Sequence, residues 1–178
     1  MSYIQVPYTT YLRETLALLA NPGLFLVAAG RNGKPNAMTI GWGTVGIVWG
    51  KPVFIVLVRP SRYTHTLLEA SDSFTVGVPS QAQHEAVAFC GAHSGRDRDK
   101  FRECGLETLP SLRVRTPGIA GCPVIYECRI VHTNEVIPAN LAGEIRARSY
   151  PSGDYHRVYF GEILLVRALP DAAELLRT

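Results

Sequence analysis

Short runs of apolar and β-branched residues, bounded by glycine, proline or asparagine, recur along most of the chain. Runs of this length between turn residues are typical of buried strands. Asn32-Gly33 is a strong tight-turn signal, so the runs on either side of it are expected to pair as a hairpin. A second turn is expected at 151–154. The pattern predicts strands at 24–29, 36–40, 53–58, 74–78, 124–136, 141–149 and 156–168.

Helical patterns are fewer and shorter than the strand patterns. Thr9 and Thr10 can cap a helix over 11–20, which Asn21-Pro22-Gly23 would end. Strands dominate and several neighbours look hairpin-linked, which favours a mostly antiparallel barrel with peripheral helices over a doubly wound sheet. Further helical stretches are predicted at 63–70, 81–89, 100–104 and 171–176, with a polar loop at 91–99 and irregular chain at 109–121.

Composition narrows the classes of protein to consider. A chain of 178 residues with 47% hydrophobic residues suits one domain over 1–178 with a real core. A net charge of +3 is too weak to favour nucleic acid or a membrane surface as partner. The start of the chain does not resemble a signal peptide, and no apolar stretch approaches the roughly 20 residues that span a bilayer. The four cysteines form no C-x-x-C pair, so we expect a cytoplasmic protein with reduced thiols and no metal site.

Two familiar motifs are present only in part. Residues 41–46 match the letters G-x-G-x-x-G, but that fingerprint needs a helix to begin at the glycines. Ile47-Val48-Trp49 and the Gly-Lys-Pro that follows indicate strand and turn instead. His84-Glu85 lacks the second histidine of a zinc protease helix. The sequence therefore argues against a dinucleotide-binding fold and a zinc protease.

The segment 59–67 carries the most informative chemistry. A buried strand ends there, Pro60 enforces an extended backbone, and hydroxyl residues stand where a helix begins. Free N–H groups at such a point attract an anion, and Arg59 and Arg62 can add charge-assisted hydrogen bonds. The alternative is a capped helix with two solvated arginines.

Two other segments could complete such a site. In 90–101, Gly91 and Gly95 allow a backbone that offers N–H groups, and Ser94, Arg96 and Lys100 are suitable phosphate donors. The alternative there is a solvated loop of alternating charges. In 36–42, a strand that flattens into glycine can present its backbone edge to a planar ring, or can simply be a barrel strand with a bulge.

Taken in order, these segments resemble the flavin reductase-like domain family and, within it, the flavoredoxin branch. The family patterns are N-x-M-T-x-[SG]-W, R-x-x-[RK]-Y-T-x-x-x-[IL], S-G-R-D-x-D-K-F, [LV]-E-C-[RK] and H-x-x-[FY]-x-G-E. The matching segments are 36–42, 59–68, 94–101, 125–129 and 156–162, and the resemblance covers about 21–166.

The resemblance implies a six-stranded split β-barrel that binds FMN, usually as a homodimer with flavin near the subunit interface. It assigns the backbone of residues 38–41 to contacts around the flavin ring and the other two segments to the phosphate and ribityl side. The residues implied as cofactor-binding are Met38, Thr39, Ile40, Gly41, Trp42, Arg59, Ser61, Arg62, Tyr63, Thr64, Cys90, Gly91, Ser94, Arg96, Asp97 and Lys100.

A histidine of the last pattern would face the flavin, where a nicotinamide could stack. His156 is the expected match because Tyr159-Phe160 supplies the aromatic residue of the pattern. The chain departs from the family in the long connection 136–155, which contains its own Gly143-Glu144-Ile145. If that tripeptide were the true match, Asn140 would replace the histidine.

These features lead to a functional hypothesis: an NAD(P)H:FMN oxidoreductase using NADH or NADPH and passing electrons to an unknown acceptor, which could be a redox protein. Hydride transfer between two stacked rings requires no protein acid or base, so no catalytic residue is assigned. Cys90 is expected to be a buried small apolar residue. The alternatives are a flavoredoxin-type electron carrier and a flavin- or haem-binding protein without turnover.

Overall fold

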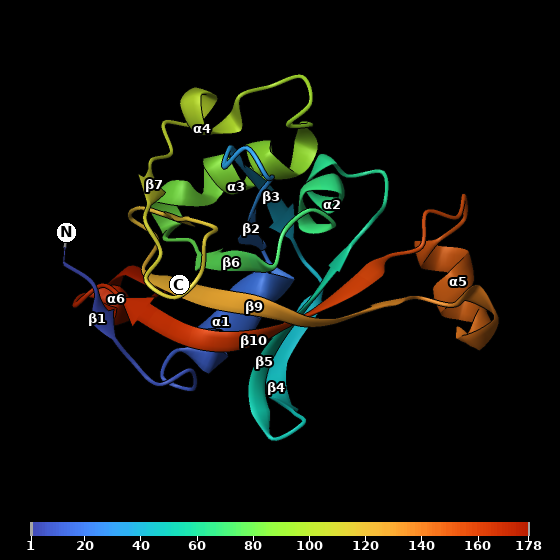
Figure 1. The fold of residues 1–178 in the computed structure, drawn as a ribbon, viewed down its shortest axis with the longest axis horizontal. Coiled ribbons are helices and arrows are strands. Elements are labelled where there is room, and N and C mark those ends of the chain that lie inside the picture. Colours follow the sequence, from blue (N-terminus) through green and yellow to red (C-terminus); the bar gives the residue numbers. More distant parts are fainter. Residues whose placement is uncertain (1, 178) are drawn as a thin grey trace.

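Eight strands form one antiparallel sheet in the computed structural model, which describes residues 2–177 (Figure 1). The predicted antiparallel sheet with peripheral helices is therefore confirmed. The sheet has two strands more than the six expected, and its hydrogen-bonded path stays open among residues 2–177. Residues 1 and 178 of the expected domain lie outside the described residues. In the order of pairing the strands are β3 (Pro35–Ile40), β2 (Leu24–Ala29), β6 (Ser73–Val78), β9 (Val124–Glu135), β10 (Arg157–Ala168), β5 (Lys51–Val58) and β4 (Gly43–Val48), with β1 (Ile4–Gln5) also paired to β10.

The helices lie around this sheet close to where the sequence predicts them. Thr9 and Thr10 do not cap the first helix, since its N-cap is Tyr11 and no side chain caps it. No helix within residues 2–177 is long and apolar enough to cross a membrane. The helices are α1 (Leu12–Ala20), α2 (Tyr63–Leu68), the short η1 (Gln81–Gln83), α3 (His84–Ala92), α4 (Lys100–Glu103) and α6 (Ala172–Leu175). Within the irregular 109–121 stretch, β8 (Gly118–Ile119) pairs with β7 (Thr108–Leu109).

The strand predicted at 141–149 is wrong. The chain there forms α5 (Gly143–Ser149), which follows the short η2 (Pro138–Asn140) at the end of a projection formed by β9 and β10 (Figure 1). Strands β9 and β10 pair directly with each other, so the intervening segment has no sheet edge to join. Its glutamate, alanine and arginines are good helix formers, and no residue of α5 is buried. We call residues 136–155 the arm.

The glycine motif at 41–46 begins no helix, which confirms that it is not a dinucleotide fingerprint. Strand β4 runs through it and pairs with β5 as a hairpin. Trp49 and Gly50 form the turn, both with positive φ (53° and 70°). This hairpin projects from the body of the molecule in Figure 1.

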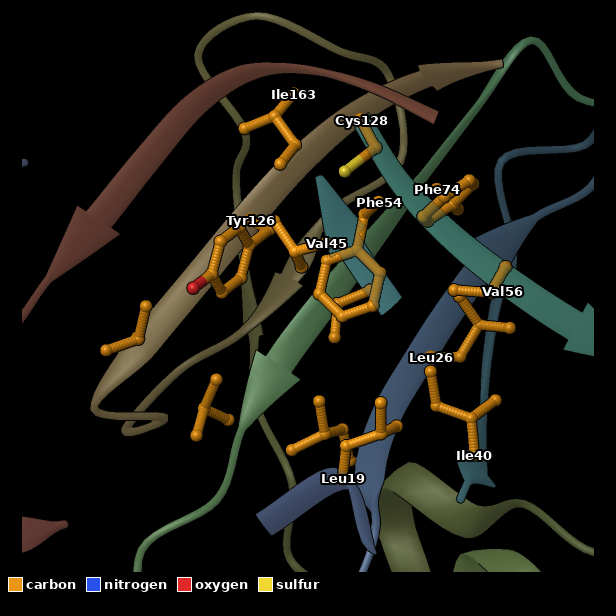
Figure 2. Packing of buried hydrophobic residues seen from close by; sticks show 14 of the residues in the cluster. Leu19, Leu26, Ile40, Val45, Phe54, Val56, Phe74, Tyr126, Cys128 and Ile163 are labelled. Carbon is orange, nitrogen blue, oxygen red and sulfur yellow. The ribbon is translucent and has the colours of Figure 1, made fainter. Parts of the chain in front are cut away.

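Alternate residues of the central strands fill two hydrophobic cores, one on each face of the sheet. Tyr126 and Cys128 of β9 enter the larger core, shown in Figure 2, where the ring of Phe54 meets Tyr126 edge-on at 5.3 Å between centroids. Ile125 enters the smaller core, which also takes in Val87 of α3. This two-sided burial explains why these strands read as continuous apolar runs.

An ion pair is buried on the second face. Arg167 lies 2.8 Å from a carboxylate oxygen of Glu127, and the side chain of Glu127 is fully buried. The same carboxylate accepts hydrogen bonds from the backbone N–H groups of Leu112 and Arg113. The pair therefore fixes the 110–116 loop to the sheet.

Candidate functional site

Two adjoining cavities lie where β3 and β5 end. The strand cavity, of about 190 Å³, lies beside residues 38–42 and also meets Leu57. The loop cavity, of about 310 Å³, lies between the turn after β5 and the 90–100 segment. Met38, Thr39 and Arg62 line both, so the two cavities adjoin one another.

Every predicted site residue lines one of these cavities, although the residues come from four separate parts of the chain. The strand cavity is lined by Met38, Thr39, Ile40, Gly41, Trp42, Leu57, Arg59, Arg62 and His156. The loop cavity is lined by Asn36, Met38, Thr39, Ser61, Arg62, Tyr63, Thr64, Cys90, Gly91, His93, Ser94, Gly95, Arg96, Asp97 and Lys100. Asn140, the alternative to His156, lines neither cavity.

A buried hydrogen bond and a close packing contact join the three segments around the loop cavity. The side-chain amide of Asn36 donates to the hydroxyl of Thr64 over 2.8 Å. Gly95 packs directly against this pair: a Cβ added there would lie 2.0 Å from Oδ1 of Asn36. Only glycine fits this close approach. The motif strand, the turn after β5 and the loop are thus fixed to one another.

Lys100 has a structural task at this site. The residue is 4% exposed, and its ammonium donates to the carbonyls of Ala37 (2.9 Å) and Cys90 (2.8 Å). Burial lowers the pKa of Lys100 from its usual range. Both hydrogen bonds tie α4 to β3 and α3, so the ammonium is engaged by the backbone. Burial also raises the pKa of Cys90 to about 12, so its side chain stays a thiol.

Two exposed arginines flank the loop cavity. Arg62 donates to the carbonyl of Gly91 over 3.4 Å. Arg96 donates to the carbonyl of Ser61 over 3.1 Å, and its guanidinium lies 5.5 Å from the ring centre of Tyr63. Each guanidinium has further N–H groups. The pair can therefore bind an anion at the rim of the loop cavity.

Arg59 and Ser61 turn toward the arm. Arg59 donates to the carbonyls of Ser149 (2.8 Å) and Asp154 (3.0 Å), and its guanidinium lies over the ring of Tyr150 at 4.9 Å. The carboxylate of Asp154 accepts from the backbone N–H (3.2 Å) and the hydroxyl (2.6 Å) of Ser61. The predicted anion-binding turn therefore holds an anionic group of the protein itself. Ser61 does not cap α2, whose N-cap is Arg62.

His156 closes the strand cavity beside Trp42. It is 8% exposed, its ring centre lies 4.9 Å from that of Trp42, and its Nδ1 lies 2.7 Å from the hydroxyl of Tyr150. Burial, and then the charge of Arg59, lower the pKa of His156 to about 4. The imidazole is therefore neutral at physiological pH.

Sequence reasoning missed the roles of Asn36 as a joint, Gly95 as a close contact, Tyr150 behind His156 and Asp154 at the turn. It also did not predict Leu57 and His93 as lining residues. Asn36 and Gly95 lie inside the matched motifs, but the resemblance assigns the cofactor contacts to their neighbours. Tyr150 and Asp154 belong to the arm, which the family patterns do not cover.

Comparison with known proteins identifies the family of this chain. The family model described as "Flavin reductase like domain" matches residues 20–176. An uncharacterized protein of Archaeoglobus fulgidus is 31% identical over 142 residues, which is 80% of this chain and 70% of that protein. The chain belongs to the flavin reductase-like domain family.

Three solved structures share the fold at low sequence identity. A flavoredoxin from Methanosarcina acetivorans superposes with a TM-score of 0.69 at 23% identity, over 96% of this chain and 77% of that one. An FMN-binding domain of a flavin reductase-like enzyme from Shewanella baltica gives 0.65 at 21%, over 94% and 77%. An NADH:FAD oxidoreductase from Streptomyces globisporus gives 0.63 at 21%, over 96% and 89%.

Proposed function

We propose that this chain binds FMN across the two adjoining cavities, as one domain whose curved sheet corresponds to the split barrel of its relatives. The strand cavity offers the backbone edge of residues 38–41 to a flat ring that needs hydrogen bonds. The loop cavity offers Arg62 and Arg96 to a phosphate. An amphipathic ligand with a planar ring at one end and a dianion at the other suits this division. The other predicted cofactor-binding residues would line the same FMN site, from Trp42 at the ring to Asp97 beside the phosphate.

The proposed activity is that of a flavin reductase using NADH or NADPH. When bound, FMN would supply the redox chemistry, as an acceptor of hydride from a nicotinamide and a donor of electrons to an acceptor. The protein holds the two rings together and limits access of water. The observation that carries this proposal is the strand cavity itself, which opens between the 38–41 edge and His156 rather than being filled by side chains.

The test is rapid mixing of FMN-loaded protein with NADH and, separately, NADPH under anaerobic conditions. The account expects loss of the oxidised flavin absorbance with one or both nicotinamides, at a rate that saturates with their concentration. A flavin that stays oxidised with both, yet is reduced by dithionite, contradicts the reductase assignment.

The second candidate is a flavoredoxin-type electron carrier with tightly held FMN. The arm favours it, because His156 closes one side of the strand cavity with Tyr150 of the arm packed behind it, which narrows the access of a second ring. A flavin reduced rapidly by a reduced ferredoxin and slowly by both nicotinamides would select the carrier.

We also propose that the chain acts as a homodimer, with the arm and the β4–β5 hairpin at the interface. Both projections expose large apolar side chains: Ile47 is 60% exposed and Trp49 62%, while Ile137 on the arm is 50% exposed. Apolar groups gathered on projections commonly mark an interface. Light scattering on the eluting protein should give twice the chain mass, and a monomer would refute this part.

A further inference from the structure

The arm places the side chain of Tyr150 against His156, on the side away from the strand cavity. Tyr150 is 5% exposed and its hydroxyl lies 2.7 Å from Nδ1 of His156. Its ring meets Trp42 edge-on at 6.3 Å and stacks on Tyr155 at 4.7 Å. Tyr150 itself lines neither cavity, so it reaches the strand cavity only through His156.

The arm is held in place by its own contacts with the turn after β5. Asp154 binds Ser61 through two hydrogen bonds, and Arg59 binds the carbonyl of Ser149 next to Tyr150. These contacts hold the backbone on both sides of Tyr150 in sequence. They therefore fix the position of the Tyr150 ring and its hydroxyl.

The direction of the Tyr150–His156 hydrogen bond follows from the bonding needs of both groups. Burial raises the pKa of Tyr150, so the phenol keeps its proton. His156 Nδ1 is the one acceptor found for this hydroxyl within residues 2–177. A buried O–H that only accepted a bond would leave its own proton unpaired. The hydroxyl therefore donates to Nδ1, and a neutral imidazole then carries its proton on Nε2.

We propose that Tyr150 is a positioning residue that holds His156 as a neutral, Nε2-protonated hydrogen-bond donor facing the strand cavity. This inference rests on the proposed function and names the ligand chemistry of that site. The second ring in the cavity must carry an acceptor, and the carboxamide oxygen of a nicotinamide is such a group. The charged groups around His156 are Arg59, Arg62 and Asp154, and the two cations disfavour a positively charged ligand.

The first experiment reads the tautomer directly and needs no cofactor. Protein labelled with ¹⁵N-histidine is examined by NMR, with His156 assigned from the signal lost in His156→Gln. The proposal expects one Nε2–H tautomer in the unaltered chain between pH 6 and pH 8, about two units or more above the pKa. An Nδ1–H tautomer in the unaltered chain overturns it.

The matched pair of variants is Tyr150→Phe and Tyr155→Phe. Each variant removes the phenol hydroxyl from one of two rings that stack on each other. Tyr150→Phe should give a mixture of tautomers without raising the pKa into the neutral range, because burial and Arg59 remain. Tyr155→Phe should leave the tautomer unchanged. Identical spectra for Tyr150→Phe and the unaltered chain overturn the positioning role.

The second experiment measures flavin reduction in the FMN-loaded proteins. A neutral hydrogen bond made equally before and during hydride transfer affects binding alone. If Tyr150→Phe leaves about half of His156 as the Nε2–H tautomer, KM for NADH should rise about two-fold with kcat unchanged. Tyr155→Phe should match the unaltered chain. An altered tautomer with unchanged KM refutes the donor role toward the ligand. If neither NADH nor NADPH reduces the flavin of the unaltered holoprotein, the proposed reductase activity is refuted, and so is the role of His156 as a hydrogen-bond donor to the nicotinamide. The tautomer measurement then still decides whether Tyr150 positions His156.

Discussion

Replacing Glu127 by glutamine should destabilise the protein far more than a conservative change at the surface would. Glu127→Gln keeps the size of the side chain and removes its charge. Three donors point at this carboxylate: the guanidinium of Arg167 and the backbone N–H groups of Leu112 and Arg113. A glutamine amide has one oxygen for these donors, and its NH₂ group would face another donor.

The size of the effect follows from the burial of both partners. Glu127 is 0% exposed and Arg167 is 6% exposed, and Nε of Arg167 has no hydrogen-bond partner within residues 2–177. Removing one partner of a buried ion pair leaves the other charge unpaired, which costs about 3–5 kcal/mol. We therefore expect the free energy of unfolding to fall by about 3 kcal/mol or more.

Urea unfolding followed by circular dichroism measures this change, and Glu162→Gln is the control. Glu162 pairs with Lys51 and Arg129, whose side chains are 47% and 54% exposed, so its loss should cost about 1 kcal/mol or less. FMN affinity should be unchanged in both variants, since neither residue lines the site. Equal destabilisation by the two variants would show that the buried pair does not hold the 110–116 loop as described.

The other predictions concern residues of the site. Gly95→Ala should weaken FMN binding, because its Cβ would displace Asn36, whereas Gly46→Ala, with open space around it, should not; fluorescence titration compares them. Arg62→Ala should lower FMN affinity about ten-fold or more through loss of a charge-assisted hydrogen bond. Arg59→Ala should instead loosen the arm, seen as faster proteolysis within 136–155, and equal loss of affinity in the two arginine variants would contradict this division. Because the pKa of His156 is about 4 when folded and 6.5 when unfolded, the unfolded chain binds more protons between these values. Stability should therefore fall with pH from 6.5 toward 4, by up to about 3 kcal/mol, and His156→Asn should remove this part of the slope; identical slopes would refute it.

The sequence predicts the sheet well where burial decides the conformation. Strands such as β2 and β9 have partners on both sides and apolar residues on both faces, so composition and turns are enough to locate them. The arm is the clear failure, because Leu141 to Ser149 has a strand-like pattern but no strand beside it. Pairing is a property of the whole sheet, which a local pattern does not contain.

The sequence predicts which residues form the candidate site, but not which contacts each of them makes there. Motif positions gave the lining of both cavities. They could not show that Lys100 binds two carbonyls or that Asp154 takes the N–H and hydroxyl of Ser61. Those contacts join residues at least 10 positions apart, and up to 93, and depend on where the arm folds back. The same residue types would suit contacts with a phosphate equally well, so the sequence motifs alone do not distinguish these two uses.

The most direct test of the proposed binding mode compares the affinities of FMN and riboflavin for the unaltered protein, by quenching of flavin fluorescence. Riboflavin has the same ring and ribityl chain but no phosphate. If Arg62 and Arg96 hold the phosphate in the loop cavity, FMN should bind at least about ten-fold tighter, since one charge-assisted hydrogen bond contributes about 1.5–3 kcal/mol. Equal affinities for the two flavins, or binding of neither, would contradict the account.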